Sequence, residues 1–240
     1  MKYIEKDYSS SAVQQYEQEL KEAQFDRESL SNPEIHKSCR GGDIYDMVKS
    51  MTSFNNLRLQ MLKDQGNICC YCGRRLFSDK HSNSTQYVVE HVVPKSLDRT
   101  LAGEYGNMLL SCRMLNIKKG DAEWDADSWH CDKSKENKQL HHTPLEVDCG
   151  DYYSYDVFGH VNGKDEDTRC DIDILNLNAK YLTELRVAAI EGELFDENAN
   201  LLSDEELRAR LDTIMNTDIN GWHSEFCFAI AGAIRNVLEP

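Results

Sequence analysis

Cysteines at metal-ligand spacing give the first chemical signal in this chain. Cys69 and Cys72 form a Cys-x-x-Cys pair, Cys112 follows after 39 residues, and Cys131 follows after another 18. Tetrahedral zinc is held by four thiolates or imidazoles, and pairs of cysteines are their usual source. Gly73, directly behind the first pair, relieves the backbone of a tight turn. The spacing therefore predicts a structural Zn²⁺ site on Cys69, Cys72, Cys112 and Cys131.

Two alternatives stay open within this ligand set. Cys70 offers a competing register for the first pair. The second half is not a compact Cys-x-x-Cys, because the residue three positions after Cys112 is Leu115. His130 precedes Cys131 and is chemically able to bind zinc in its place. We take Cys131 as the fourth ligand.

An acidic residue beside a histidine gives the second signal. Glu90 and His91 lie at the end of an apolar stretch that Pro94 closes. Neighbouring side chains of a regular strand point to opposite faces, so a local bend is needed for both to serve one site. On its own the pair is a weak motif, and a surface Glu-His pair explains it better. Its position between the cysteines makes it a candidate for catalysis.

The motifs occur in a characteristic order: CxYC at 69–72, EHxxPKS at 90–96, NxLLSC at 107–112 and HCDxxK at 130–135. In this order they resemble the HNH (ββα-metal) endonuclease superfamily in its four-cysteine form. More narrowly, they resemble the PtuB subfamily, the HNH subunit of Septu anti-phage systems, which also accompanies some retrons. The MKYIEK opening and the ILNLN segment at 174–178 are similar to that subfamily as well.

The resemblance implies a role for each matching residue. His91 matches the general base that activates water, and Asn107 matches the asparagine that fixes the loop and orients the histidine. Glu90 matches the acidic ligand of the catalytic metal, although the superfamily usually has Asp there. Asp132 matches the third position, at the start of a helix. If that helix begins at 116–120 instead, Asn116 becomes the ligand.

The chemistry of phosphodiester hydrolysis agrees with these roles. The reaction needs a deprotonated water and a cation that stabilises charge on the phosphoryl oxygens. A neutral imidazole accepts a proton at cellular pH, and carboxylates favour Mg²⁺ or Mn²⁺ over a second zinc. We thus predict structural zinc on sulfur and catalytic Mg²⁺ or Mn²⁺ on Glu90 and Asp132. The candidates for phosphate contacts, each equally explained as solvated surface charge, are Lys95, Arg113, Lys118 and Lys135.

The sequence pattern of the elements that must position these residues predicts an α+β, mostly helical fold. The resemblance places a small ββα-metal HNH core in it, between N-terminal and C-terminal helices. Hydrophobic periodicity predicts five helices, and a β-branched run predicts a first short strand; a second short strand and a hairpin that turns at Phe158-Gly159 are predicted as well. The predicted helices are 11–28, 44–63, 179–194, 204–215 and 224–238; the strands are 86–93 and 107–111; the hairpin is 151–162. Ser203 and Glu206 form a capping box. We expect an N-terminal helical segment (1–64), a nuclease core (65–145) and a C-terminal hairpin and acidic helical region (146–240).

The charge of the chain is unevenly distributed. The net charge is -15, but residues 65–120 carry eight Lys/Arg against four Asp/Glu, whereas residues 145–240 carry seven against 21. The basic region is small, so tight substrate binding needs help from a partner. The first residues are charged, which predicts no secretory signal, and no apolar run has the length of a membrane span. We expect a cytoplasmic location, with the nine cysteines as thiols and metal ligands.

The leading hypothesis is an endonuclease with DNA as the default substrate, and RNA, including tRNA, stays open. A competing hypothesis is a zinc-stapled binding module without catalysis. The sequence has no Gly-rich Lys-Ser/Thr loop for a nucleotide. The resemblance implies a PtuA-like ABC-type ATPase partner in anti-phage defence, and retron reverse transcriptase with its DNA in some systems. The acidic C-terminal region is a candidate docking surface, or simply a solvated face.

Overall fold

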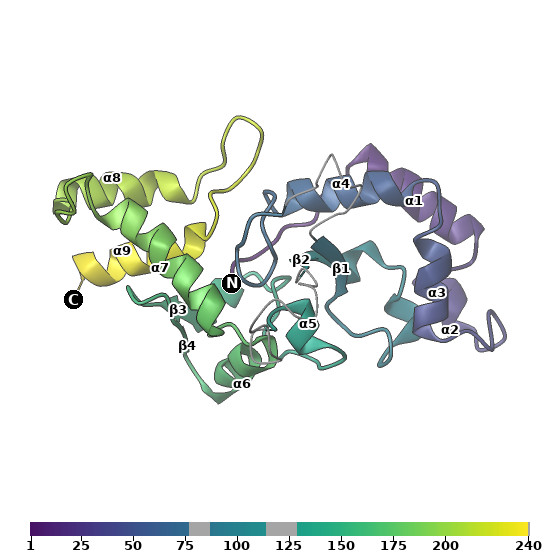
Figure 1. Cartoon of the computed structure of the whole chain (residues 1–240). Coiled ribbons are helices and arrows are strands. Elements are labelled where there is room, and N and C mark those ends of the chain that lie inside the picture. The colour runs from purple at the N-terminus through teal and green to yellow at the C-terminus, as the bar shows by residue number, and fades with distance from the viewer. Residues whose placement is uncertain (77–86, 114–128, 240) are drawn as a thin grey trace, which may run out of the picture.

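The fold is α+β, with helices at both ends of the molecule and short strands between them. The computed structural model describes residues 1–76, 87–113 and 129–239. Helices α1–α4 lie at one end and α7–α9 at the other, with β1, β2 and α5 between them (Figure 1). The α-helices are α1 Ser11–Glu22, α2 Arg27–Ser31, α3 Gly41–Val48, α4 Phe54–Asp64, α5 Asp132–Lys135, α6 Glu166–Leu175, α7 Lys180–Leu194, α8 Asp204–Ile214 and α9 Cys227–Leu238. The strands are β1 Tyr87–His91, β2 Met108–Cys112, β3 Tyr153–Tyr155 and β4 Val161–Gly163, and the short 3-10 helices are Arg99–Leu101, Tyr105–Asn107 and Cys149–Tyr152.

The predicted helix 11–28 is shorter than expected. Helix α1 buries Val13, Tyr16 and Leu20, one face of a 3.6-residue repeat, and ends at Glu22. Gln24 then adopts a positive φ of 57°, which interrupts the helical hydrogen bonds. Asp26 accepts a hydrogen bond from Ser29 N and starts the separate helix α2.

The predicted helix 44–63 is also two helices, because a side chain from α1 binds the backbone at the break. The Glu19 carboxylate accepts hydrogen bonds from Thr52 N and Ser53 N, each at 3.0 Å. These two amides are therefore not available to extend α3, and α4 begins at Phe54. The apolar repeat runs through the break, so periodicity alone gave no sign of it.

The two predicted strands of the candidate site form an antiparallel hairpin. Residue Glu90 of β1 pairs with Leu109 of β2, and His91 pairs with Met108. Every residue of β2 is buried, consistent with a strand covered on both faces. The one-turn helix α5 follows directly after Cys131, and Asp132 N donates to the buried Ser111 Oγ on β2 at 3.3 Å. This bond places the start of α5 against the hairpin.

The C-terminal part confirms the hairpin and helices predicted there and adds α6. Strands β3 and β4 pair as expected around Gly159, which has a φ of 75°. The capping box of α8 is present, with Ser203 Oγ 2.7 Å from a Glu206 carboxylate oxygen. Helix α6 was not predicted, although Asp165 caps its first turn through Thr168 N at 2.8 Å.

Contacts join the N-terminal and C-terminal parts through the segment that carries the cysteines. His223 N donates to Gly66 O and Phe226 N donates to Gly73 O, both at 2.9 Å. Cys131 N donates to Leu175 O, at the end of α6, at 2.8 Å. The three-segment division stays a prediction. No helix within the described ranges has the length and apolar character required to cross a bilayer.

Candidate active site and metal centre

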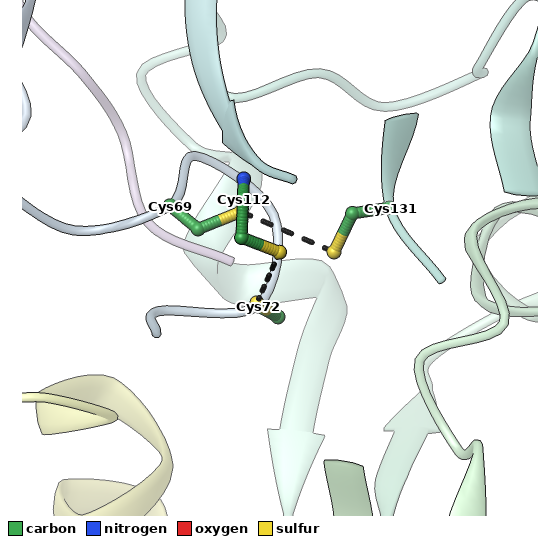
Figure 2. A group of neighbouring side chains, drawn as sticks. All are labelled: Cys69, Cys72, Cys112 and Cys131. Atoms are coloured by element: carbon green, nitrogen blue, oxygen red, sulfur yellow. Dashed lines mark hydrogen bonds between the residues drawn. The ribbon is translucent and has the colours of Figure 1, made fainter. Parts of the chain in front are cut away.

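Four buried cysteines from three separate segments come together in one cluster (Figure 2). The cluster contains Cys69, Cys72, Cys112 and Cys131, whose sulfur atoms all lie within 4.8 Å of one another. Cys69 Sγ lies 3.9 Å from Cys131 Sγ, and Cys72 Sγ lies 3.7 Å from Cys112 Sγ. A tetrahedron with metal–sulfur bonds of about 2.3 Å has sulfur–sulfur edges of about 3.8 Å. The cluster therefore has the size and donor atoms to hold a metal such as zinc.

The first pair of cysteines lies on a tight turn whose backbone is fixed by neighbouring strands. Cys70 N donates to Leu110 O at 3.1 Å, and Gly73 N donates to Cys69 O at 3.1 Å. Cys112 N donates to Cys69 Sγ at 3.3 Å, as expected for a sulfur held as thiolate. Cys70 lies outside the cluster, so the competing register is wrong.

The fourth member of the cluster is Cys131, and His130 lies beside it rather than in it. His130 Nδ1 is 3.2 Å from Cys131 Sγ and 3.7 Å from Cys112 Sγ. Burial lowers the pKa of His130 to about 4, so its imidazole is neutral and Nδ1 can donate a proton to sulfur. His130 thus has the position of a hydrogen-bonding neighbour of the ligands.

The pKa values of Cys69 and Cys131 are shifted in opposite directions. Burial raises the pKa of Cys69, but hydrogen bonds from Cys112 and Cys131 outweigh it, and the pKa of Cys69 falls well below its usual value. Burial raises the pKa of Cys131 well above its usual value. A metal cation would displace the remaining protons, because only the thiolate is a strong ligand.

The predicted carboxylates Glu90 and Asp132 are neighbours. Glu90 is buried, and its Oε1 accepts from Lys135 Nζ at 2.7 Å and from Tyr71 OH at 2.9 Å. Burial, and next the adjacent Asp132 carboxyl, raise the pKa of Glu90 to about 8, while the Lys135 ammonium lowers it. Lys135 pairs with Glu90, so the two carboxyl groups and this one ammonium together carry a net negative charge when both acids are ionised. A divalent cation would relieve that excess.

His91 lies close to this pair but faces a different set of residues. Its ring packs edge-on against Tyr45 of α3, with ring centroids 4.7 Å apart. Within the ranges that the structure describes, only the four cysteines bring three or more candidate ligand atoms within 4.8 Å of one another. The histidine is therefore not a third ligand of the carboxylate pair in this arrangement, as expected for neighbours on a regular strand.

The hydrogen bonds of His91 determine which nitrogen is free to accept a proton. Nε2 lies 2.9 Å from Ala102 O, and because a carbonyl only accepts, Nε2 carries the proton. The lone pair is then on Nδ1, which lies 3.2 Å from Lys95 Nζ. Burial, and next the Lys95 ammonium, lower the pKa of His91 to about 3, so the imidazole is neutral at cellular pH. Nδ1 is thus the candidate base.

Asn107 braces the loop that follows His91. Its Oδ1 accepts from Val93 N at 2.7 Å, and its Nδ2 donates to Val93 O at 3.0 Å and Leu101 O at 3.1 Å. Leu101 precedes Ala102, whose carbonyl accepts from His91. The amide therefore holds both the strand end that carries the imidazole and the carbonyl that orients it.

The predicted phosphate contacts have different positions. Lys95 is half-buried beside His91, and Arg113 is exposed. Lys135 is only 1% exposed and is bonded to Glu90 and to His91 O, so it is not a solvated surface charge, and its contact with phosphate stays a prediction. Lys118 lies outside the described residues, and so does the alternative ligand Asn116.

Sequence reasoning missed Tyr71, Tyr45 and the Ala102 carbonyl, which contact Glu90 and His91. Tyr71 stands inside the CxYC motif, so its position was a usable signal. Tyr45 and Ala102 come from other segments and have no local signal. No family model matches the chain, and no curated protein matches it either.

Proposed function

We propose that this protein is a metal-dependent HNH endonuclease that hydrolyses nucleic-acid phosphodiester bonds, with DNA as the default substrate. The observation that carries the proposal is a neutral, buried imidazole at the end of β1, next to the buried Glu90 and the half-buried Asp132 at the start of α5. A hairpin and a short helix position both, in the strand–strand–helix order typical of the superfamily. The four-cysteine cluster, whose member Cys131 directly precedes Asp132, would hold structural zinc.

Glu90 and Asp132 would hold Mg²⁺ or Mn²⁺, hard cations that prefer carboxylate oxygen. When bound, the cation stabilises negative charge on the phosphoryl and leaving oxygens. The bonds from Tyr71 and Lys135 both end on Glu90 Oε1, which leaves Oε2 for another partner. Tyr71 and Lys135 would thus orient the carboxylate.

His91 would take the proton from the attacking water at Nδ1, while its Nε2 proton stays on the Ala102 carbonyl. When no substrate is bound, the Lys95 ammonium lies against the Nδ1 lone pair of His91. A phosphate offers the ammonium a stronger, charge-assisted partner than an imidazole. We therefore expect substrate to draw Lys95 away and expose Nδ1.

The proposal predicts that His91→Ala abolishes cleavage. Purified protein with its zinc in place should cut duplex DNA in Mg²⁺ or Mn²⁺, and the variant should lose about 10²-fold or more of that rate. Parallel assays on single-stranded RNA and tRNA distinguish the substrate. Lys133→Ala, which changes an exposed residue on α5, is the matched control and should cut at the parent rate. Equal cleavage by His91→Ala would refute the mechanism.

A binding module without catalysis is the alternative, and one observation favours it. Lys135 and Lys95 already stand against Glu90 and His91, so both sites have a cationic partner without a metal. This alternative predicts zinc but no dependence on a second metal. Titration of Mn²⁺ into protein that keeps its zinc discriminates the two, because only the nuclease has a second, carboxylate-dependent site.

The family resemblance extends the proposal to a cellular role as effector of a bacterial anti-phage defence system. It implies a PtuA-like ABC-type ATPase partner and, in some systems, a retron reverse transcriptase with its DNA. The acidic residues 145–240 are the candidate docking surface. Co-expression and co-purification with such an ATPase test it, and a protein that never associates would count against the role.

A further inference from the structure

A groove of about 650 Å³ lies beside His91 on the far side of Lys95. Its walls are the start of helix α3, the loop after β1 and one residue that follows α5. The residues used below are Arg40, Gly41, Gly42, Asp43, Lys95 and Arg99. Lys95 lines the groove, and its Nζ lies 3.2 Å from His91 Nδ1. The groove is therefore within one side chain of the candidate base.

We propose that this groove binds the sugar-phosphate backbone next to the scissile phosphate, with Arg40 and Lys95 as the phosphate contacts. The inference rests on the proposed nuclease function and says where the substrate backbone lies on the protein. The charges of the groove are Arg40, Lys95 and Arg99 against Asp43. Such an excess of positive charge is unusual in a chain of net charge -15, and it lies beside the site rather than on a remote face.

Some charged side chains of the groove are held by the protein itself, and others are free to contact a substrate. Arg99 donates to four backbone carbonyls between Leu30 and Cys39, so it fixes the wall and is not free for substrate. The Arg40 side chain is 88% exposed, and its pairing with Asp43 is an exposed contact at 3.3 Å. An exposed pair of this kind is weak, so a phosphate can compete for the guanidinium.

The glycines leave room for a backbone to approach. A Cβ on Gly41 would lie 2.2 Å from Lys95 O, so only glycine lets α3 begin against the loop that carries Lys95. A Cβ on Gly42 would meet nothing within 4 Å, and the residue is exposed. Gly42 thus faces open space in the first turn of α3, where the helix dipole adds to the positive field of the two side chains.

Gly42 allows a test that separates binding from folding. An acidic residue in the first turn favours the helix, so Gly42→Asp should keep or raise the Tm. The same carboxylate would repel phosphate, so binding should fall. Gly42→Lys adds the opposite charge at the same position and should retain binding. A merely structural role would move Tm and binding together.

The experiment measures fluorescence anisotropy of labelled 20-mer duplex DNA, single-stranded DNA and single-stranded RNA against the zinc-loaded His91→Ala protein. Arg40→Glu should raise the Kd about fivefold to tenfold and reduce the salt dependence of log Kd by about one ion. Arg208→Glu, the same charge change on exposed α8, is the matched control and should have little effect. The nucleic acid that shows the loss is the one that the groove takes.

Each outcome bears on the groove. The proposed binding of nucleic acid in the groove is excluded if Arg40→Glu and Gly42→Asp bind all three nucleic acids as tightly as Arg208→Glu does. It is also excluded if the parent His91→Ala protein binds none of them. Cleavage by the protein with His91 intact is scored separately. Cleavage without an effect of Arg40 would leave the nuclease proposal standing and refute the groove. Binding that depends on Arg40, without cleavage by the protein that has His91, would support the groove and refute the nuclease proposal.

Discussion

Lys135 and Glu90 show how one ion pair determines the electrostatics of the candidate site. The pair is 2.7 Å long, and the two side chains are 1% and 3% exposed. Each charge has further partners, since Lys135 also donates to His91 O and Tyr71 donates to Glu90. Those partners offset the cost of taking both charges out of water. Removing Lys135 leaves the buried Glu90 carboxyl group without its cation, and removing Glu90 leaves the buried Lys135 ammonium without its anion.

At this scale we predict that Lys135→Met destabilises the fold by about 3 kcal/mol, the lower end for breaking a buried pair. The loss is at the lower end because Glu90, whose pKa is already raised to about 8, can take up a proton when its partner is removed. Urea unfolding at pH 7 measures it. Lys133→Met, on the exposed side of the same helix, should change stability by less than about 0.5 kcal/mol. Equal midpoints for both variants would show that the pair is not formed.

Helix α5 is too short to be stable on its own, and its neighbours hold it in place. It has four residues, and Cys131, which precedes it, has a φ of 55°, a conformation that residues other than glycine rarely adopt. The bond from Asp132 N to Ser111 Oγ and the Cys131 sulfur in the cluster fix its start. The position of Asp132 therefore depends on the cysteine cluster.

At this scale we predict that Cys131→Ser loses the zinc and Cys170→Ser retains it. Cys131 is a member of the cluster, whereas Cys170 is exposed on α6. Metal analysis of each purified protein should give one zinc per chain for Cys170→Ser and well below one for Cys131→Ser. Since zinc binding adds directly to folding free energy, Cys131→Ser should also have a lower Tm. Full zinc occupancy in Cys131→Ser would point to His130 as a ligand instead.

The two ends of the molecule are joined at the turn that carries Cys69 and Cys72. Gly73 lies directly behind it with a φ of 79°, and a Cβ there would lie 2.7 Å from the ring of Phe228 on α9. Phe226 N bonds to the carbonyl of the same glycine. The turn that carries Cys69 and Cys72 therefore packs against α9, and a substitution that disturbs one should destabilise the other.

At this scale we predict that Gly73→Ala destabilises the whole fold by more than about 1 kcal/mol, through backbone strain and the clash with Phe228. Gly192→Ala should do the opposite. That glycine is inside α7 with nothing near its Cβ, so alanine should stabilise the helix by up to about 1 kcal/mol. Thermal unfolding followed by circular dichroism compares the two. Unchanged stability in Gly73→Ala would mean that the turn and α9 are not packed as described.

The sequence by itself determined the features that depend on local spacing. Cysteine positions predicted the ligand cluster, the β-branched run at 86–93 predicted β1, and a Ser–Glu pair predicted the start of α8. The strand and cap signals lie within the elements they specify, whereas the cysteines give a signal over a longer range because a metal site requires a fixed set of ligand types. The candidate roles of Glu90, His91 and Asp132 came from motif order, and they stay proposals.

Only the tertiary structure decided which residues meet across the chain. Glu19 interrupts a continuous apolar repeat, Lys135 is buried against Glu90, and the Ala102 carbonyl selects the free nitrogen of His91. Each of these contacts joins segments that no periodicity connects. Hydrogen bonds and ion pairs depend on distance in space, and distance in space between remote segments is fixed only when the core has packed.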